Sequence, residues 1–222
     1  MKKVLLLILF FTTSLSAQTT KIKYWLDPEG KEIKEKVIDI ISEQYPDNAM
    51  AYRKTIDSGI VYQFNAPKYS TYKVDYKFVK AEIEKITNQK YSNSAIFMIK
   101  FDYLDDSCDG LFSNTIDNEK INSIKYYDSP IKLKLEQKSD LIYLSFFEDK
   151  IILKNKPRTK NDYFFSDKNH FFRNNLFLHP TICGSFGLIK PNGETLIRNG
   201  AYRLDLMFEH LTPEIWNLFF QQ

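Results

Sequence analysis

Residues 184–200, GSFGLIKPNGETLIRNG, contain the clearest supersecondary signal in this chain of 222 residues. Two short apolar segments flank Lys190-Pro191-Asn192-Gly193, and the Asn-Gly pair is typical of a tight hairpin turn that requires positive φ angles. We therefore predict a β-hairpin. A helix is expected over residues 201–211, and Pro213 is expected to open a last helical segment, because proline is favoured at the first helical position.

The segments before the hairpin alternate between strand-like and helical patterns. AIFMIKFDYL (95–104) and LIYLSFFED (141–149) are nearly continuous apolar runs, which predicts strands buried on both faces of a sheet. A loop and a helix are expected between them, and Pro130 is expected to break that helical pattern. YFFSD (163–167) predicts a third short strand, and KNHFFRNNLF (168–177) has helical spacing. This order predicts the α/β class.

The first part of the chain predicts a smaller mixture of strands and helices. A short strand and a turn precede Ile33, where a helix is expected to begin, and residues 50–75 predict a strand pair. Residues 76–89 have helical spacing. The side chains expected to face inward from this helix are Phe78, Val79, Ile83 and Ile86. We place a domain boundary near residue 92.

The leader MKKVLLLILFFTTSLSAQ predicts the compartment. Lys2 and Lys3 precede an apolar run over residues 4–11, and small residues follow up to Ala17. This pattern predicts a secretory signal peptide over residues 1–17, and the alternative is an uncleaved N-terminal anchor. The apolar run is short beside the roughly 20 residues of a membrane-spanning helix. We expect an exported protein, periplasmic or secreted, with no integral membrane segment after cleavage.

The charge balance argues against a nucleic-acid partner. The chain has 31 basic and 28 acidic residues, and removal of Lys2 and Lys3 with the leader leaves almost no net charge. A nucleic-acid-binding domain carries a clear basic excess. The aromatic content of 15% suits a packed, β-containing core.

Cys108 and Cys183 are the only cysteines. In an oxidising compartment an even pair is compatible with a disulfide. The sequence offers a single intramolecular pairing, but it does not by itself show that the two residues meet.

The order of the predicted elements resembles the thioredoxin fold over about residues 93–212. It is most similar to exported thiol–disulfide oxidoreductases and their peroxiredoxin relatives, above all in residues 163–200, which contain a hairpin of the FLI-x-P-x-G kind. The resemblance implies a thioredoxin-like central sheet flanked by helices in residues 93–222. Residues 18–92 would then form an N-terminal α+β extension.

The same resemblance implies positions for the two cysteines. Cys108 stands where the family has the nucleophile of its CxxC motif, but Leu111 replaces the second cysteine. Gly184 stands where the family has a cis-proline, and Cys183 precedes it. Because that preceding residue faces the nucleophile in the family, the resemblance implies that Cys183 faces Cys108.

The loop around Cys108 is acidic, since it contains Asp102, Asp105, Asp106 and Asp109 and no lysine or arginine. Nearby negative charge raises a thiol pKa, so Cys108 is poorly suited to act as an activated nucleophile. A structural disulfide between Cys108 and Cys183 would close a loop of about 75 residues and contribute roughly 4–4.5 kcal/mol in the chain-entropy model. A redox-active pair and two buried free thiols are the alternatives.

No metal or cofactor is predicted. The aspartates of the cysteine loop do not have EF-hand spacing, and Ser113 stands where that motif needs glutamate. His170, His179 and His210 form no i, i+4 pair, so a zinc site would have to come from distant segments. Ser185 lacks the G-x-S-x-G spacing of a hydrolase nucleophile.

Together these patterns favour an exported, degenerate thioredoxin-like protein that acts as a binding or structural component of the cell envelope, with an unidentified envelope protein as its partner. The alternative is a periplasmic thiol–disulfide redox protein that uses Cys108 with Cys183. The sequence favours a non-catalytic role and leaves the enzyme alternative open.

Overall fold

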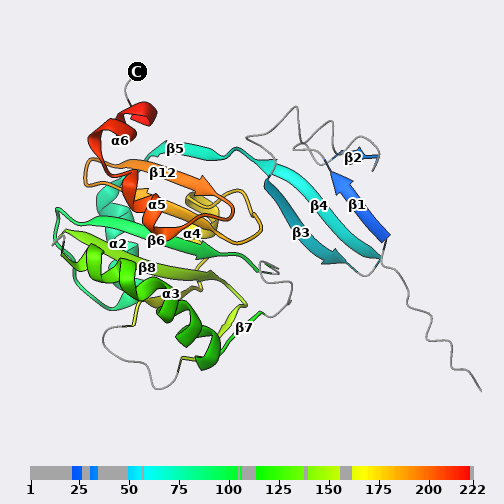
Figure 1. Cartoon of the computed structure of the whole chain (residues 1–222), viewed down its shortest axis with the longest axis horizontal. Helices are drawn as coiled ribbons and strands as arrows, with labels where there is room; N and C mark the ends of the chain where they lie inside the picture. Colours follow the sequence, from blue (N-terminus) through cyan, green and yellow to red (C-terminus); the bar gives the residue numbers. More distant parts are fainter. Residues whose placement is uncertain are drawn as a thin grey trace, which may run out of the picture.

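The computed structural model describes residues 22–26, 31–34, 50–56, 58–104, 106, 114–137, 140–155 and 162–220. It is an α/β protein with mixed sheets flanked by helices (Figure 1). The predicted leader, Cys108, Leu111 and most of the helix expected after Ile33 lie outside the described residues.

A six-stranded sheet forms the centre of the protein, in the order β10-β8-β6-β11-β12-β5. β10, β8 and β6 are parallel, whereas β11, β12 and β5 each run antiparallel to the preceding strand in this order. The strands are β5 (Tyr69–Lys73), β6 (Ile96–Asp102), β8 (Leu141–Glu148), β10 (Phe164–Asp167), β11 (Ser185–Ile189) and β12 (Glu194–Asn199). The predicted strands in residues 95–104, 141–149 and 163–167 and the predicted hairpin are confirmed.

β6 lies near the middle of the sheet, and its apolar sequence explains why. Phe97, Met98, Ile99 and Phe101 are fully buried, so both faces of this strand are covered. Strands with two buried faces need apolar side chains in succession. Lys100 is the one charged residue that interrupts this run.

The turn of the β11–β12 hairpin differs from the predicted one. The Gly193 N–H donates to the Lys190 carbonyl over 2.9 Å, and Gly193 has a φ of 85°. Asn192 has no positive φ, so the expected pair of positive angles is wrong. Pro191 precedes Asn192 and holds its own φ near −65°, which favours a type I turn followed by a left-handed glycine.

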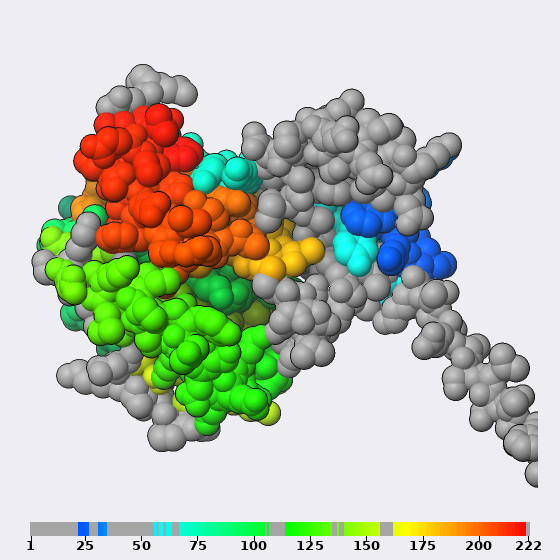
Figure 2. Space-filling model, viewed as in Figure 1, coloured from blue at the N-terminus to red at the C-terminus, as the bar shows by residue number. Residues whose placement is uncertain are grey.

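Helices cover both faces of the six-stranded sheet (Figure 1). α2 (Tyr76–Thr87) and α4 (Phe171–Asn175) lie on one face, where Phe78 and Phe171 meet with ring centroids 5.6 Å apart. α3 (Asn118–Glu136), α5 (Leu204–Glu209) and α6 (Pro213–Phe220) lie on the other face. The green surface of α3 is open to solvent in Figure 2.

The inward face of α2 is only partly as predicted. Val79 and Ile83 are buried, but Phe78 is 56% exposed. Tyr76 is buried in its place, and its hydroxyl donates to the Ala95 carbonyl over 2.7 Å. Positions 76, 79 and 83 lie on one stripe of a helix, and position 78 lies off that stripe.

α3 continues through Pro130, so the expected break there is wrong. Proline removes one N–H from the helical ladder and crowds the preceding turn. Tertiary contacts hold the helix on either side of this defect: before it, Asp128 accepts from the Tyr143 hydroxyl over 3.0 Å, and after it, Lys132 Nζ lies 5.1 Å from the centroid of the Tyr163 ring. Tertiary packing therefore outweighs the local cost of the proline.

Pro130→Ala is expected to stabilise the protein by about 1–3 kcal/mol, because it restores a helical hydrogen bond and removes the ring clash. Chemical denaturation measures the change in the free energy of unfolding. Pro213→Ala is the matched control, since Pro213 occupies the first position of α6, and no gain is expected there. Equal gains at both positions would contradict this explanation.

A second sheet is formed by β1 (Ile22–Leu26), β2 (Glu32–Ile33), β3 (Met50–Ile56) and β4 (Gly59–Ala66) in the order β2-β1-β4-β3. The predicted first strand and the predicted strand pair are confirmed, but Ile33 lies in β2 and not in a helix. β5 and α2 also precede residue 92, yet β5 pairs with β12 and α2 packs near β10. A short pair, β7 (Thr115–Ile116) and β9 (Ile152–Leu153), completes the strands among the described residues.

Candidate functional site

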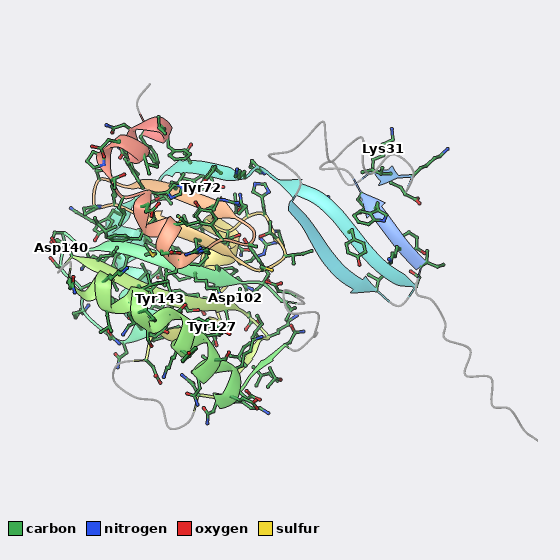
Figure 3. All side chains as sticks on the ribbon, in the orientation of Figure 1. Lys31, Tyr72, Asp102, Tyr127, Asp140 and Tyr143 are labelled. Carbon is green, nitrogen blue, oxygen red and sulfur yellow. The ribbon has the colours of Figure 1, made fainter. Side chains whose placement is uncertain are left out.

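A cleft of about 600 Å³ lies where β6 and β8 end. Its walls are the end of β6, the β7 strand, the first turns of α3 and the turn before β11, which contains Cys183. The carboxyl ends of parallel strands are where open α/β sheets bind ligands. Figure 3 shows Asp102, at the end of β6, close to Tyr127 on α3.

Cys183 is tied to the loop that follows β6. Its N–H donates to Asp106 Oδ1 over 2.9 Å, although the two residues are 77 positions apart. Asp106 precedes Cys108 by two residues, so the structure places the chain next to Cys108 in contact with Cys183. Among the described residues no cysteine is free. Cys108 lies outside them, and its pairing with Cys183 stays a prediction.

Gly184 occupies a position where any side chain would be strained. Its φ is +70°, and a Cβ atom there would lie 2.6 Å from the Phe101 carbonyl oxygen and 2.8 Å from Asp102 Oδ1. The resemblance places a cis-proline at this point of the family. A proline cannot adopt this positive φ, so the backbone of this turn departs from that pattern.

A buried hydroxyl network supports the same turn. The Tyr103 hydroxyl donates to Ser185 Oγ over 3.1 Å, and Thr181 Oγ1 donates to the Gly184 carbonyl over 2.9 Å. Thr181 and Ser185 are also 3.1 Å apart at their hydroxyl oxygens. Burial raises the pKa of Tyr103. Ser185 is thus a strand residue with a structural role, as its lack of a nucleophile motif predicted.

Lys100, like Tyr127, lines the candidate site and was not predicted from the sequence. Its Nζ lies 3.4 Å from Asp102 Oδ1 inside the cleft. Burial lowers the pKa of Lys100, but the negative charges of Asp102, Asp128 and Asp106 outweigh burial and leave this pKa above its ordinary value. Lys100 therefore stays cationic. The available signal was a single lysine within the apolar run of residues 95–104.

Asp128 connects α3 to the sheet below Lys100. Its Oδ2 accepts from the Tyr143 hydroxyl over 3.0 Å and from the Tyr163 hydroxyl over 3.4 Å. Burial is the largest influence on the pKa of Asp128 and raises it, against the opposing effects of Lys100 and the two hydroxyls. The fold therefore favours the protonated carboxyl more strongly than the unfolded chain does.

This direction of shift predicts a pH effect. Stability that comes from protonated Asp128 is present below the unfolded pKa and is lost as pH rises through the folded pKa. Asp128→Asn keeps an oxygen acceptor for the tyrosines and removes this titration. Its stability relative to the unmodified protein is therefore expected to increase between pH 4 and pH 7, measured by denaturant unfolding at each pH. Asp140→Asn, at the start of β8 and exposed, is the control; a parallel change there would contradict the assignment.

An ion pair holds the chain directly after β6. Glu148 Oε1 lies 3.1 Å from Arg173 Nε, and Glu148 Oε2 accepts the Leu104 N–H over 2.8 Å. The Arg173 guanidinium also lies over the ring of Tyr103, 5.9 Å from its centroid. These contacts fix the direction in which the chain leaves β6 toward Asp106.

The three histidines are spread over the fold. His170 precedes α4 and lies 3.5 Å from Asp149, whereas His210 follows α5 and lies 3.1 Å from the Tyr69 hydroxyl. His179 lies between α4 and β11. Within the described ranges, no group of three histidine, cysteine or acidic residues could hold a metal ion.

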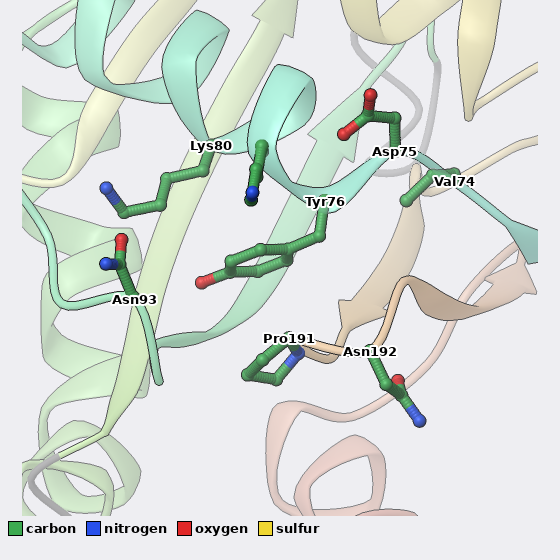
Figure 4. A pocket seen from close by; sticks show the side chains of 8 residues that line it. Val74, Asp75, Tyr76, Lys80, Asn93, Pro191 and Asn192 are labelled. Atoms are coloured by element: carbon green, nitrogen blue, oxygen red, sulfur yellow. The ribbon is translucent and has the colours of Figure 1, made fainter.

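A second cavity, of about 660 Å³, lies at the opposite end of the sheet, between the start of α2 and the hairpin turn (Figure 4). Three of its polar side chains already have structural partners. The Tyr76 hydroxyl donates to a backbone carbonyl, Lys80 pairs with Glu84 at 2.7 Å, and Asp75 caps α2. We therefore regard the smaller cleft beside Cys183 as the candidate site.

Comparison with protein-family models, with curated proteins and with solved structures found no match to this chain. Among the helices that the structure describes, none is long and apolar enough to cross a membrane.

Proposed function

We propose that the protein is an exported, degenerate thioredoxin-like module that acts as a binding or structural component of the cell envelope. The arrangement of the larger sheet supports this proposal. β6, which leads into the cysteine loop, has the parallel strand β8 on one side and the antiparallel β11–β12 hairpin on the other. In this proposal Cys108 and Cys183 form a structural disulfide.

The observation that carries the proposal is the hydrogen bond from the Cys183 N–H to Asp106 Oδ1. It supports the approach of the two cysteine-bearing loops, and it also sets a carboxylate beside Cys183. Negative charge raises the pKa of a nearby thiol and reduces the thiolate that redox catalysis requires. The arrangement therefore favours a structural disulfide over a catalytic one.

One observation favours the alternative, a periplasmic thiol–disulfide redox protein. Lys100 brings a cation into the same cleft, and a cation near a thiol favours the thiolate. Lys100 is already 3.4 Å from Asp102, and this carboxylate offsets its charge. We therefore keep the redox protein as the second candidate.

Redox titration distinguishes the two functions. Natively prepared protein is expected to contain no alkylatable thiol by intact mass, and its disulfide is expected to have a potential below roughly −300 mV, as structural disulfides do. Denatured and reduced protein, with two alkylatable thiols, is the control. Two alkylatable thiols in the native sample would refute the disulfide. A bond that opens near roughly −270 mV, the thioredoxin potential, with insulin reduction that Cys108→Ser abolishes, would establish the redox alternative.

A further inference from the structure

The cleft beside Cys183 has a surplus of negative charge. Among the described residues, four carboxylates line it, from Asp102, Asp106, Asp117 and Glu119, against the two lysines Lys100 and Lys120. Asp102 Oδ2 is buried and has no hydrogen-bond donor among the described residues. Glu119 is exposed in the first turn of α3 and, within the same part of the chain, has no ion-pair partner. The lining therefore favours a cationic occupant.

The same cleft has apolar walls. Ile124 and Tyr127 contribute from α3, and Phe147 and Ile151 contribute from the end of β8 and the turn after it. Tyr127 is 72% exposed and lines the same cleft as Asp102; both are labelled in Figure 3. Exposed tyrosines next to a pocket are typical anchors of protein interfaces. Phe147 and Ile151 are already buried, so the apolar surface that an occupant could cover belongs to Ile124 and Tyr127, and a metal cation would leave that surface exposed.

We propose that this cleft binds a cationic, apolar polypeptide segment of a partner protein. An apolar side chain of the segment packs against Ile124 and Tyr127, and flanking lysine or arginine side chains face Glu119 and Asp102. A volume of about 600 Å³ holds one or a few side chains and falls within the usual range of binding pockets. The inference rests on the proposed binding function, whose partner it describes by its chemistry.

A peptide titration tests the charge and the apolar requirement separately. The probe is an acetylated, amidated heptapeptide in which lysine alternates with leucine and phenylalanine, titrated by calorimetry into the whole protein at low salt and at about 0.5 M salt. Binding is expected to weaken at high salt, because exposed charges are screened. The same peptide with glutamate in place of lysine is expected not to bind. A lysine–glycine peptide is expected to bind at least tenfold more weakly.

Two pairs of variants locate the binding. Tyr127→Ala is expected to weaken binding of the lysine-containing probe at least fivefold. Tyr126→Ala, at a neighbouring tyrosine that is 77% exposed but does not line the cleft, is expected to change it less than twofold. Glu119→Lys is expected to weaken binding at least fivefold and to reduce its salt dependence. Glu214→Lys, exposed on α6, is the matched control.

The inference is overturned if the lysine probe does not bind, if the glutamate peptide binds better, or if the two tyrosine variants behave alike. The redox titration on the same protein separates these failures from failure of the proposed function. A structural disulfide without peptide binding would refute only the partner chemistry. A labile disulfide would refute the non-catalytic role whether or not the peptide binds.

Discussion

Gly184→Ala is expected to destabilise the protein by about 3 kcal/mol or more. An L-residue in the left-handed region costs roughly 1–2 kcal/mol. The new Cβ would also lie 2.6 Å from the Phe101 carbonyl oxygen, and this backbone atom is held in the sheet pairing of β6 with β11. The turn would have to move away from β6, and this movement would strain the hydrogen bond between the Cys183 N–H and Asp106. Loss of stability and loss of the cleft are therefore expected together.

Denaturant unfolding of the variant measures this effect, and Gly187→Ala is the matched control. Gly187 lies in β11, three residues after Gly184, and has no positive φ. Its added Cβ would approach only the ends of side chains, Ile197 Cδ1 at 2.9 Å and Phe177 Cζ at 3.1 Å. A cost of roughly 1–2 kcal/mol is expected there, because side chains can adjust. A smaller cost at Gly184 than at Gly187 would show that the turn is not constrained as described.

Phe101→Ala is expected to cost about 3–5 kcal/mol, the usual range when a buried phenylalanine is truncated. The Phe101 ring is fully buried, stacks on Phe177 at a centroid distance of 4.7 Å and meets the edge of Tyr103 at 5.2 Å. β6 is paired with β8 on one side and β11 on the other, so the strand itself is not free to move into the space. The cavity would therefore persist, directly beneath the end of β6 that supports Asp102.

The comparison variant for Phe101→Ala is Phe78→Ala. Phe78 is 56% exposed on α2, and a cost below about 1 kcal/mol is expected, because truncation there leaves no enclosed cavity. Thermal and denaturant unfolding of both variants give the two values. Similar costs at the two positions would be incompatible with a core centred on β6.

The strands were the most predictable part of this fold. Residues 95–104 and 141–149 are apolar in succession because both faces of β6 and β8 are buried, and this pattern is visible without any partner. Pro130 misled the prediction, because a local rule ends the helix there, whereas tertiary contacts of Asp128 before it and Lys132 after it hold both sides of the helix. Asn192 misled the prediction for a local reason. The neighbouring Pro191 favours a type I turn, in which Asn192 does not need a positive φ.

The candidate site was less predictable. The approach of Cys183 to the loop after β6 came from a resemblance, and the contact with Asp106 supports it without describing Cys108. Lys100 and Tyr127 were missed because each lies inside a pattern that has a simpler meaning. A lysine in a strand and a tyrosine in a helix become candidate site residues only when the fold places both of them at the same cleft.

The sequence by itself determined the types of the main elements, the charge balance, and the presence of two cysteines in a chain with a predicted export leader. These properties depend on residues a few positions apart, which set helical or strand periodicity. The tertiary structure alone decided that Asp106 meets Cys183, that Asp128 lies near Lys100, and that acidic and apolar side chains share one cleft. Such contacts depend on strand order and on burial, because groups far apart in the chain interact only after the sheet has brought them together.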